Sequence, residues 1–326
     1  HGTILANLLQ ISSTQASGEG EAGNAPRIAL FLEEEAGQWH VRRLAEAMRR
    51  RGASVVVTSL PRCAFDTALP SGIDIPGFDG ALPDAVFVRS ISAGTLEQIT
   101  FRLGLLHALR ISGVRVWNDA RAIERCVDKS MTTFLLHRAG IPTPRTRTVE
   151  VDANAQAYVE AARRRLIFKP LFGSQGKGLL QIDGVADLPE GEAADHIYHL
   201  QDYVPPPADT FEDWRVIATR KRPVAAMRRR GKSWVTNVHQ GGAPVACEIE
   251  PEMADLAAAA LAAVDADYGG IDLIRGPDGR LMVLEVNSNP SWRGLQSVSE
   301  VDIADAVVAD FFAAVAAHQD VHRCSA

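Results

Sequence analysis

Two short apolar segments near the C-terminal end of the chain restrict this region to a β-hairpin. Residues 271–275 (IDLIR) and 281–286 (LMVLEV) are rich in aliphatic side chains, and residues 276–279 (GPDG) lie between them. Apolar runs of this length, bounded by glycine and proline, are typical of strands paired across a turn. We therefore expect an antiparallel pair of strands here.

Three oxygen-bearing side chains lie on this predicted hairpin. Alternation with period two puts Glu285 and Asn287 on one face, and the turn brings Asp272 beside them. Hard oxygen ligands of this kind suit Mg²⁺ bridging the phosphates of a nucleotide. The alternative is a hydrogen-bonded hairpin with a polar face, but two acids and an amide among apolar neighbours would be costly without a cation. The hairpin thus predicts a metal site.

A lysine and a glycine-rich loop provide a second signal. Only five lysines occur among the 34 basic residues, and Lys169 ends the apolar strand predicted at residues 166–170. The loop at residues 173–178 (GSQGKG) follows, and its glycines can expose backbone N–H groups to an anion. It lacks GxxxxGK[ST] and is not a Walker A loop. A snorkelling lysine and an ordinary hairpin turn are the simpler alternatives, but together the two features predict a phosphate-binding lid.

Composition narrows the class of protein. A chain of 326 residues with 46% hydrophobic residues is long enough for several packed units that share one cleft. The net charge of −6 argues against a broad nucleic-acid-binding face. The four cysteines lie far apart without a CxxC pair, so neither a zinc site nor a disulfide framework is indicated. No apolar run approaches a membrane span and no basic leader is evident, so we expect a cytoplasmic protein without a membrane partner.

Strand and helix signals divide the chain into an α/β part and an α+β part. The expected elements before residue 140 are strands at 27–32, 54–58, 85–88 and 114–117, and helices at 39–51, 95–110 and 121–139. Those after it are strands at 145–149, 166–170, 179–182, 215–218, 224–229, 271–275 and 281–286, and helices at 153–164, 251–266 and 303–318. No GxGxxG follows the first strand, so no dinucleotide site is expected.

Several stretches between residues 120 and 294 resemble, in order, the motifs of ATP-grasp enzymes of the RimK type. They are DKSMTTFLLHRAGIPTPRT, IFKPLFGSQGKGL, QDYV, DWRV, NVHQGGA, and GIDLI with LEVNSNP. The resemblance implies an α/β ATP-grasp fold with a pre-ATP-grasp parallel α/β domain. The implied units are a flexible tail (1–25), the pre-ATP-grasp domain (26–120), the lid subdomain with its linker helix (121–204) and the C-terminal subdomain (205–326).

The same resemblance implies roles for individual residues. Those implied to bind ATP are Lys129, Lys169, Ser174, Gln175, Gly176, Gln201, Asp202, Tyr203, Val204 and Asp213. Those implied to face the γ-phosphate and an acyl phosphate are Arg215, Arg229 and Asn237, and the implied ligands of Mg²⁺ or Mn²⁺ are Asp272, Glu285 and Asn287. Two simpler alternatives remain: a solvated basic strand end at residues 228–230, and a cross-strand ion pair of Asp213 with Arg215.

Three residues are candidates for substrate binding. Arg89 follows the strand at 85–88 and could hold a substrate carboxylate, although a surface arginine is an equal alternative. Asn289 and Trp292 lie near the implied acceptor site, where an indole could stack on a flat pterin or furan. A core or rim tryptophan is the simpler explanation for Trp292.

The expected activity is ATP-dependent ligation of an amino acid to the carboxylate of a small-molecule acceptor. Glutamate is the expected amino acid, and a coenzyme is the favoured acceptor. One alternative is a coenzyme-binding protein of the same fold with reduced or no turnover. Another is a ligase acting on the C-terminus of a ribosomal protein, which the acidic net charge does not favour. The resemblance also implies a homodimer or homotetramer.

Overall fold

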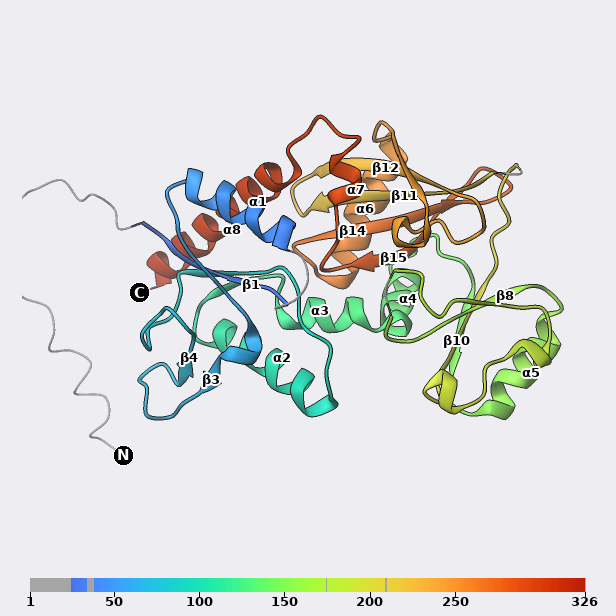
Figure 1. Ribbon diagram of the computed structural model, residues 1–326, viewed down its shortest axis with the longest axis horizontal. Helices are drawn as coiled ribbons and strands as arrows, with labels where there is room; N and C mark the ends of the chain where they lie inside the picture. The colour runs from blue at the N-terminus through green and yellow to red at the C-terminus, as the bar shows by residue number, and fades with distance from the viewer. Residues whose placement is uncertain (1–24, 34–37, 174, 209, 326) are drawn as a thin grey trace, which may run out of the picture.

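The computed structural model describes residues 25–33, 38–173, 175–208 and 210–325 (Figure 1). The tail proposed over residues 1–25 therefore lies almost wholly outside the described part, and Ser174 lies outside it as well. Within the described residues the strands form one parallel sheet, two larger antiparallel sheets and a two-stranded ribbon.

The N-terminal sheet is parallel, as the alternation of strand and helix predicts. Its strand order is β2-β1-β5-β6, and its strands are β1 (Arg27–Phe31), β2 (Ser54–Thr58), β5 (Ala85–Val88) and β6 (Arg115–Trp117). The helices of this part are α1 (Gln38–Arg50) and α2 (Leu96–Ile111), and the short ribbon is formed by β3 (Ala64–Phe65) and β4 (Ile73–Asp74). All four residues of β5 are buried, as expected for a strand covered on both faces.

The central sheet is antiparallel, with strand order β7-β10-β8-β9. Its elements are β7 (Thr146–Val149), α5 (Asp152–Ala162), β8 (Leu166–Lys169), β9 (Leu180–Ile182) and β10 (Tyr198–Asp202). No strand was expected at β10, although it is an inner strand of the sheet. Its segment YHLQD mixes polar and apolar residues, and the buried side chains of His199 and Gln201 are satisfied by hydrogen bonds to residues of the neighbouring strands β7 and β8.

The C-terminal sheet contains the predicted hairpin, now seen as the antiparallel pair β14–β15. The strand order is β13-β12-β11-β14-β15. Its strands are β11 (Phe211–Thr219), β12 (Pro223–Gly231), β13 (Ala243–Ala246), β14 (Tyr268–Arg275) and β15 (Leu281–Asn287), and its helices are α6 (Pro251–Val264), α7 (Arg293–Gln296) and α8 (Ile303–Ser325). Short 3₁₀ helices lie at Leu60–Arg62, Val185–Asp187, Glu192–Ala194 and Val238–Gln240.

The single linker helix predicted at residues 121–139 is wrong. The structure has two helices there, α3 (Ala120–Val127) and α4 (Lys129–Arg138), separated at Asp128. Asp128 is extended (φ −84°, ψ 102°), and its carboxylate accepts hydrogen bonds from the backbone N–H groups of Ser130 at 2.8 Å and Met131 at 3.1 Å. Aspartate is a favoured N-cap residue, so the break has a local cause. It makes Lys129 the first residue of α4.

The last helix packs against the first. In Figure 1 the red α8 lies beside the blue α1, and Arg51 holds Asp305 across this contact at 2.6 Å. One buried core includes Leu30 and Trp117 of the N-terminal sheet, Ile217 of the C-terminal sheet and Phe311 of α8. The N-terminal and C-terminal sheets therefore share a core. None of the helices in the described residues has the length and apolar character of a membrane span.

Candidate active site

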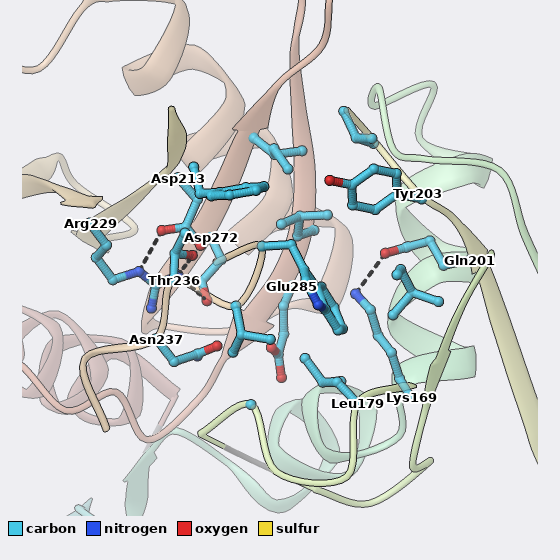
Figure 2. Close-up of a pocket in the computed structure, with 18 of the residues that line it drawn as sticks. Lys169, Leu179, Gln201, Tyr203, Asp213, Arg229, Thr236, Asn237, Asp272 and Glu285 are labelled. Carbon is cyan, nitrogen blue, oxygen red and sulfur yellow. Dashed lines mark hydrogen bonds and ion pairs between the residues drawn. The ribbon is translucent and has the colours of Figure 1, made fainter. Parts of the chain in front are cut away.

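A cavity lies between the central sheet and the C-terminal sheet. Lys129 and Lys169 line it together with Asp272 and Glu285. Figure 2 shows the same arrangement, with Lys169 and Gln201 facing the group formed by Arg229 and the carboxylates. The structure thus places the predicted lysines and the predicted acids around one space.

Lys169 is held in place by the neighbouring strand. Its Nζ donates a hydrogen bond to Oε1 of Gln201 at 2.6 Å, and Nε2 of Gln201 donates to Oγ1 of Thr146 at 3.1 Å. Burial lowers the pKa of Lys169, the nearby carboxylate of Glu285 opposes that shift, and the charge of Lys129 adds to it. A half-buried cation that donates its hydrogen bond to a neutral amide oxygen is suited to receive an anionic group.

His199 is a neighbour of this lysine that sequence reasoning missed. It is directly opposite Lys169 in the β8–β10 ladder, and its Nδ1 lies 2.8 Å from Oγ1 of Thr148. Burial and the two nearby lysines lower the pKa of His199 to about 3, so the imidazole is neutral. His199 is two residues from Gln201, and this spacing places both side chains on one face of a strand. The spacing could indicate this only once residues 198–202 were known to form a strand.

Lys129 ties helix α4 to the glycine-rich loop. Its Nζ donates hydrogen bonds to the backbone carbonyls of Gly173 at 2.7 Å and Leu171 at 3.4 Å. Burial lowers the pKa of Lys129, and Glu285 opposes the shift. The lysine predicted to bind phosphate therefore also anchors one end of the predicted lid.

The described part of the loop approaches Asn237 closely. Gly176 has φ +71°, and a Cβ built on it would lie 2.6 Å from Oδ1 of Asn237. Gln175 beside it also has a positive φ of 63°. Two features therefore favour glycine at this position: the left-handed backbone and the narrow gap to Asn237. The loop and the residue predicted to face the γ-phosphate lie together.

The hairpin register sets the predicted metal ligands side by side. Asp272 is directly opposite Glu285, and Asn287 is opposite Gly270 at the end of the same ladder. Within the described residues the carboxylate of Glu285 has no hydrogen bond or ion pair, whereas Nδ2 of Asn287 donates to the carbonyl of Gly270 at 3.5 Å. These positions leave acceptor oxygens of Glu285 and Asn287 available to a cation.

Asp272 belongs to a buried cluster with Asp213, Arg215 and Arg229. Arg215 binds Asp272 through two hydrogen bonds of 2.7 and 2.8 Å, and Arg229 binds Asp213 through two of 2.7 and 2.6 Å. Nη2 of Arg229 also lies 3.0 Å from Oδ2 of Asp272. The suggested pair of Asp213 with Arg215 is therefore wrong, because each residue pairs with another partner across the ladder. The suggestion of a solvated strand end is also wrong for Arg229, which is buried.

The ion pairs of this cluster keep Asp272 and Arg229 charged. Burial alone would raise the pKa of Asp272, but Arg215 and Arg229 hold it well below its ordinary value. Burial alone would lower the pKa of Arg229, but Asp272 and Asp213 raise it. A carboxylate offers about four lone-pair positions, and the arginines occupy three of those of Asp272. One position on Oδ1 remains, so the residue fits a cation that it shares with Glu285 and Asn287.

The segment predicted to receive adenine lines the same cavity. The backbone N–H groups of Asp202 and Tyr203 are already donated to the carbonyls of Arg145 at 2.8 Å and Arg165 at 3.1 Å. The carboxylate of Asp202 is 2.8 Å from Nε of Arg164. Asp213 likewise has both oxygens engaged by Arg229. These contacts give Asp202 and Asp213 structural partners in addition to the nucleotide roles expected of them.

A second cavity of about 940 Å³ adjoins the first. Gln175, Arg229 and Asn237 line both, whereas Arg215 and Asn287 line only the second. Arg89 and Asn289 line the second cavity as well, so the idea of a surface position for Arg89, which is 6% exposed, is wrong.

Trp292 is not among the residues that line either cavity. Its side chain is fully buried, and its backbone N–H donates to Nε2 of His40 at 3.0 Å. The structure therefore supports the simpler explanation, a core tryptophan. The stacking of this indole on a flat acceptor finds no support in its position.

Several known proteins are similar to this chain in sequence. A family model described as a RimK-like ATP-grasp domain matches residues 126–311. The tetrahydromethanopterin:alpha-L-glutamate ligase of Methanococcus maripaludis is 35% identical over 228 residues, which cover 68% of this chain and 76% of that protein. A probable alpha-L-glutamate ligase of Alkalilimnicola ehrlichii is 30% identical over 294 residues, covering 86% of this chain and 93% of that protein.

Solved structures with a similar fold include the ATP-grasp ligase PsnB complexed with a minimal precursor and the D-cycloserine synthetase DcsG. The first has a TM-score of 0.68 at 22% identity and covers 90% of this chain and 99% of that chain. The second has a TM-score of 0.66 at 20% identity and covers 89% and 99%. At these identities the likeness shows the fold, which is the ATP-grasp fold expected from the sequence.

Proposed function

The chain belongs to the RimK-like ATP-grasp family and is an ATP-dependent carboxylate–amine ligase, and from this premise we propose that it joins L-glutamate to a carboxylate of a small coenzyme. A pterin or furan one-carbon carrier is the proposed acceptor class. Support for the amino acid and for a pterin comes from the relatives whose names include tetrahydromethanopterin and alpha-L-glutamate ligase.

One observation carries the proposal: Lys129, Lys169, Asp272 and Glu285 line a single cavity, and Figure 2 shows Lys169 facing the group that contains Asp272. The two lysines would attract a triphosphate in this cavity. The carboxylates would repel it unless a divalent ion lay between. Asp272, Glu285 and Asn287 would hold that ion, Mg²⁺ or Mn²⁺, which would draw charge from the γ-phosphate when bound.

The proposed reaction has two steps. An oxygen of the acceptor carboxylate attacks the γ-phosphorus of ATP, ADP leaves, and an acyl phosphate forms. The unprotonated amine of glutamate then attacks the acyl carbon, inorganic phosphate leaves, and the nitrogen loses one proton. Positioning and charge stabilisation are the protein's share of such chemistry, which accords with a site built from lysines, arginines and amides.

Arg229 and Asn237 have the position that this sequence of steps requires. Both line the first cavity, where ATP is proposed to bind, and also the second, which is open to the other substrates. A phosphoryl group passing from ATP to the acceptor would move through this shared boundary. Arg229 stays protonated because Asp213 and Asp272 raise its pKa against the effect of burial, and it can therefore stabilise the charge on that group.

A screen for ADP release tests the proposal. Reduced pterins and furan coenzymes that carry a carboxylate are mixed with the protein, Mg²⁺ and ATP, with and without glutamate, and the products are weighed by mass spectrometry. We expect ADP release that depends on both substrates and a product heavier by one glutamyl residue. Ligand binding without ADP release from any acceptor would contradict the proposal and favour a carrier protein.

A further inference from the structure

Two residues that line the second cavity each carry a buried polar atom without a partner. Among the described residues, Nε of Arg89 and Oδ1 of Asn289 are buried and form no hydrogen bond. Nη1 of Arg89 donates to the carbonyl oxygen of Asn289 at 3.3 Å, so the two groups are neighbours. Leaving a buried donor or acceptor unpaired costs about 1–3 kcal/mol. A ligand that accepts from Arg89 and donates to Asn289 would remove that cost.

The chemistry of these two groups fits an α-amino acid. Arg89 and Asn289 both line the cavity, and one offers a cationic donor while the other offers a neutral acceptor. An α-carboxylate beside an ammonium or amine presents the complementary pair. Burial lowers the pKa of Arg89, and within the described residues no carboxylate forms an ion pair with it, so an anion from the substrate would supply the missing charge.

A second arginine lies at the exposed edge of the same cavity. Arg293 of α7 is exposed and forms no ion pair among the described residues. Glu33 is the one acidic residue among the described residues that line this cavity. Arg215 and Arg229 are already paired with Asp272 and Asp213. Among the arginines that line this cavity, Arg89 and Arg293 are therefore the two without a carboxylate partner in the described part of the chain.

A series of contacts through three aromatic rings connects these two arginines. The guanidinium of Arg89 lies 5.3 Å from the ring of Trp292, and that of Arg293 lies 5.9 Å from the ring of Trp39. His40 stands between the tryptophans, with edge-on contacts of 4.6 Å to Trp292 and 4.9 Å to Trp39. The series connects two residues of α1 with the residue that follows β5 and with the start of α7.

His40 does not add a third positive charge to this series. Burial lowers its pKa to about 3, and Arg89 and Arg293 contribute to the shift. The neutral ring accepts the backbone N–H of Trp292. Arg89 and Arg293 therefore carry the positive charges at the two ends of this series of ring contacts.

We propose that the second cavity binds the amino-acid substrate and selects a dicarboxylate. Arg89 and Asn289 take its α-carboxylate and its amine, and Arg293 takes its side-chain carboxylate. This assignment rests on the proposed ligase function and adds the residues that choose the amino acid. Arg89 takes the α-carboxylate because its partner Asn289 is two residues from Asn287, on the side where the amine must react.

Steady-state kinetics with glutamate and glutamine as competing donors tests the proposal. Arg293→Gln should raise the KM for glutamate about tenfold or more while leaving the KM for glutamine unchanged, since a charge-assisted hydrogen bond is lost with the first donor only. Arg89→Gln should raise the KM for both, because both donors carry the α-carboxylate. The KM for ATP should stay constant in both variants.

Two controls make the outcome decisive. Arg220→Gln removes an exposed arginine whose ion pair with Asp265 lies outside both cavities, and it should change neither KM. Arg89→Lys keeps a charge if the glutamine variant of that buried residue fails to fold. An unchanged ratio of glutamate to glutamine KM in Arg293→Gln overturns this assignment while leaving the ligase intact. Absence of glutamate-dependent ADP release in the unaltered protein instead overturns the proposed function.

Discussion

Arg215 holds the carboxylate of Asp272 through two hydrogen bonds, 2.7 Å from Nε to Oδ1 and 2.8 Å from Nη2 to Oδ2. Asp272 lies directly across the β14–β15 ladder from Glu285. One of the two facing acids is therefore neutralised by arginine, whereas the other has no ion pair among the described residues. We infer that Glu285 contributes most of the negative charge offered to a metal ion.

Glu285→Gln should abolish most of the ligase activity while the protein stays folded. The substitution keeps the shape of a half-buried side chain but removes the charge that would hold the ion. We expect ADP release to fall about 100-fold or more, with the urea-unfolding midpoint unchanged. Glu300→Gln, an exposed position, is the matched control. Full turnover in Glu285→Gln would show that the assigned metal site is wrong.

Lys169→Met should weaken ATP binding about 10- to 100-fold, since a charge-assisted contact contributes about 1.5–3 kcal/mol. The methionine retains the apolar stem and removes the ammonium held by Gln201. Isothermal titration with a non-hydrolysable ATP analogue measures the change. Lys221→Met removes an exposed lysine and should have no effect. Equal affinity in the two variants would contradict a phosphate-binding role.

Asp213→Ala should destabilise the protein by about 3 kcal/mol. It removes one partner of a buried bidentate pair and leaves the charge of Arg229 partly uncompensated. Arg230→Ala breaks the exposed pair with Glu212 and should cost less than about 1 kcal/mol. Denaturant unfolding measures both changes. Similar losses of unfolding free energy in the two variants would mean that the buried pair stabilises the protein no more than the exposed pair does.

The contact between α1 and α8 should weaken in acid. Hydrogen bonds from Arg51, supported by Arg50, lower the pKa of Asp305 from 3.8 to about 2. The folded state therefore favours the carboxylate, and this stabilisation is present above pH 3.8 and is lost as the pH falls towards 2. Asp305→Asn should show a shallower loss of unfolding free energy over this range, and Asp255→Asn, at an exposed position of α6, should keep the full slope. Identical slopes would refute this linkage.

Gly176→Ala should impair ATP-dependent turnover more than it impairs stability. The new methyl group would need a left-handed backbone at φ +71° and would approach Oδ1 of Asn237 to 2.6 Å. Gly52→Ala imposes a similar backbone cost, about 1 kcal/mol, at φ +82° with nothing within 4 Å. Only Gly176→Ala should raise the KM for ATP. An equal KM for ATP in both variants would mean that the loop does not contact the nucleotide.

Local patterns in the sequence were sufficient for the hairpin and for its acids. The period of two along residues 281–286 and the turn at 276–279 act over a few residues, so the pairing of Asp272 with Glu285 could be predicted from them. The break at Asp128 was also local, because aspartate caps the helix that follows. It was missed because the apolar pattern continues through it.

The sequence by itself determined most of the strands and helices, the motifs that identify the family, and the kinds of side chain available to the site. The tertiary structure decided which residues and strands pair. Arg215 forms its ion pair with Asp272 and not with Asp213, and β10 pairs with a strand on each edge. It also brought Arg89 and Arg293 to one cavity, although they are far apart in the chain. Ion pairs and cavities depend on which elements lie side by side, and that depends on burial summed over the whole chain, which no short segment contains.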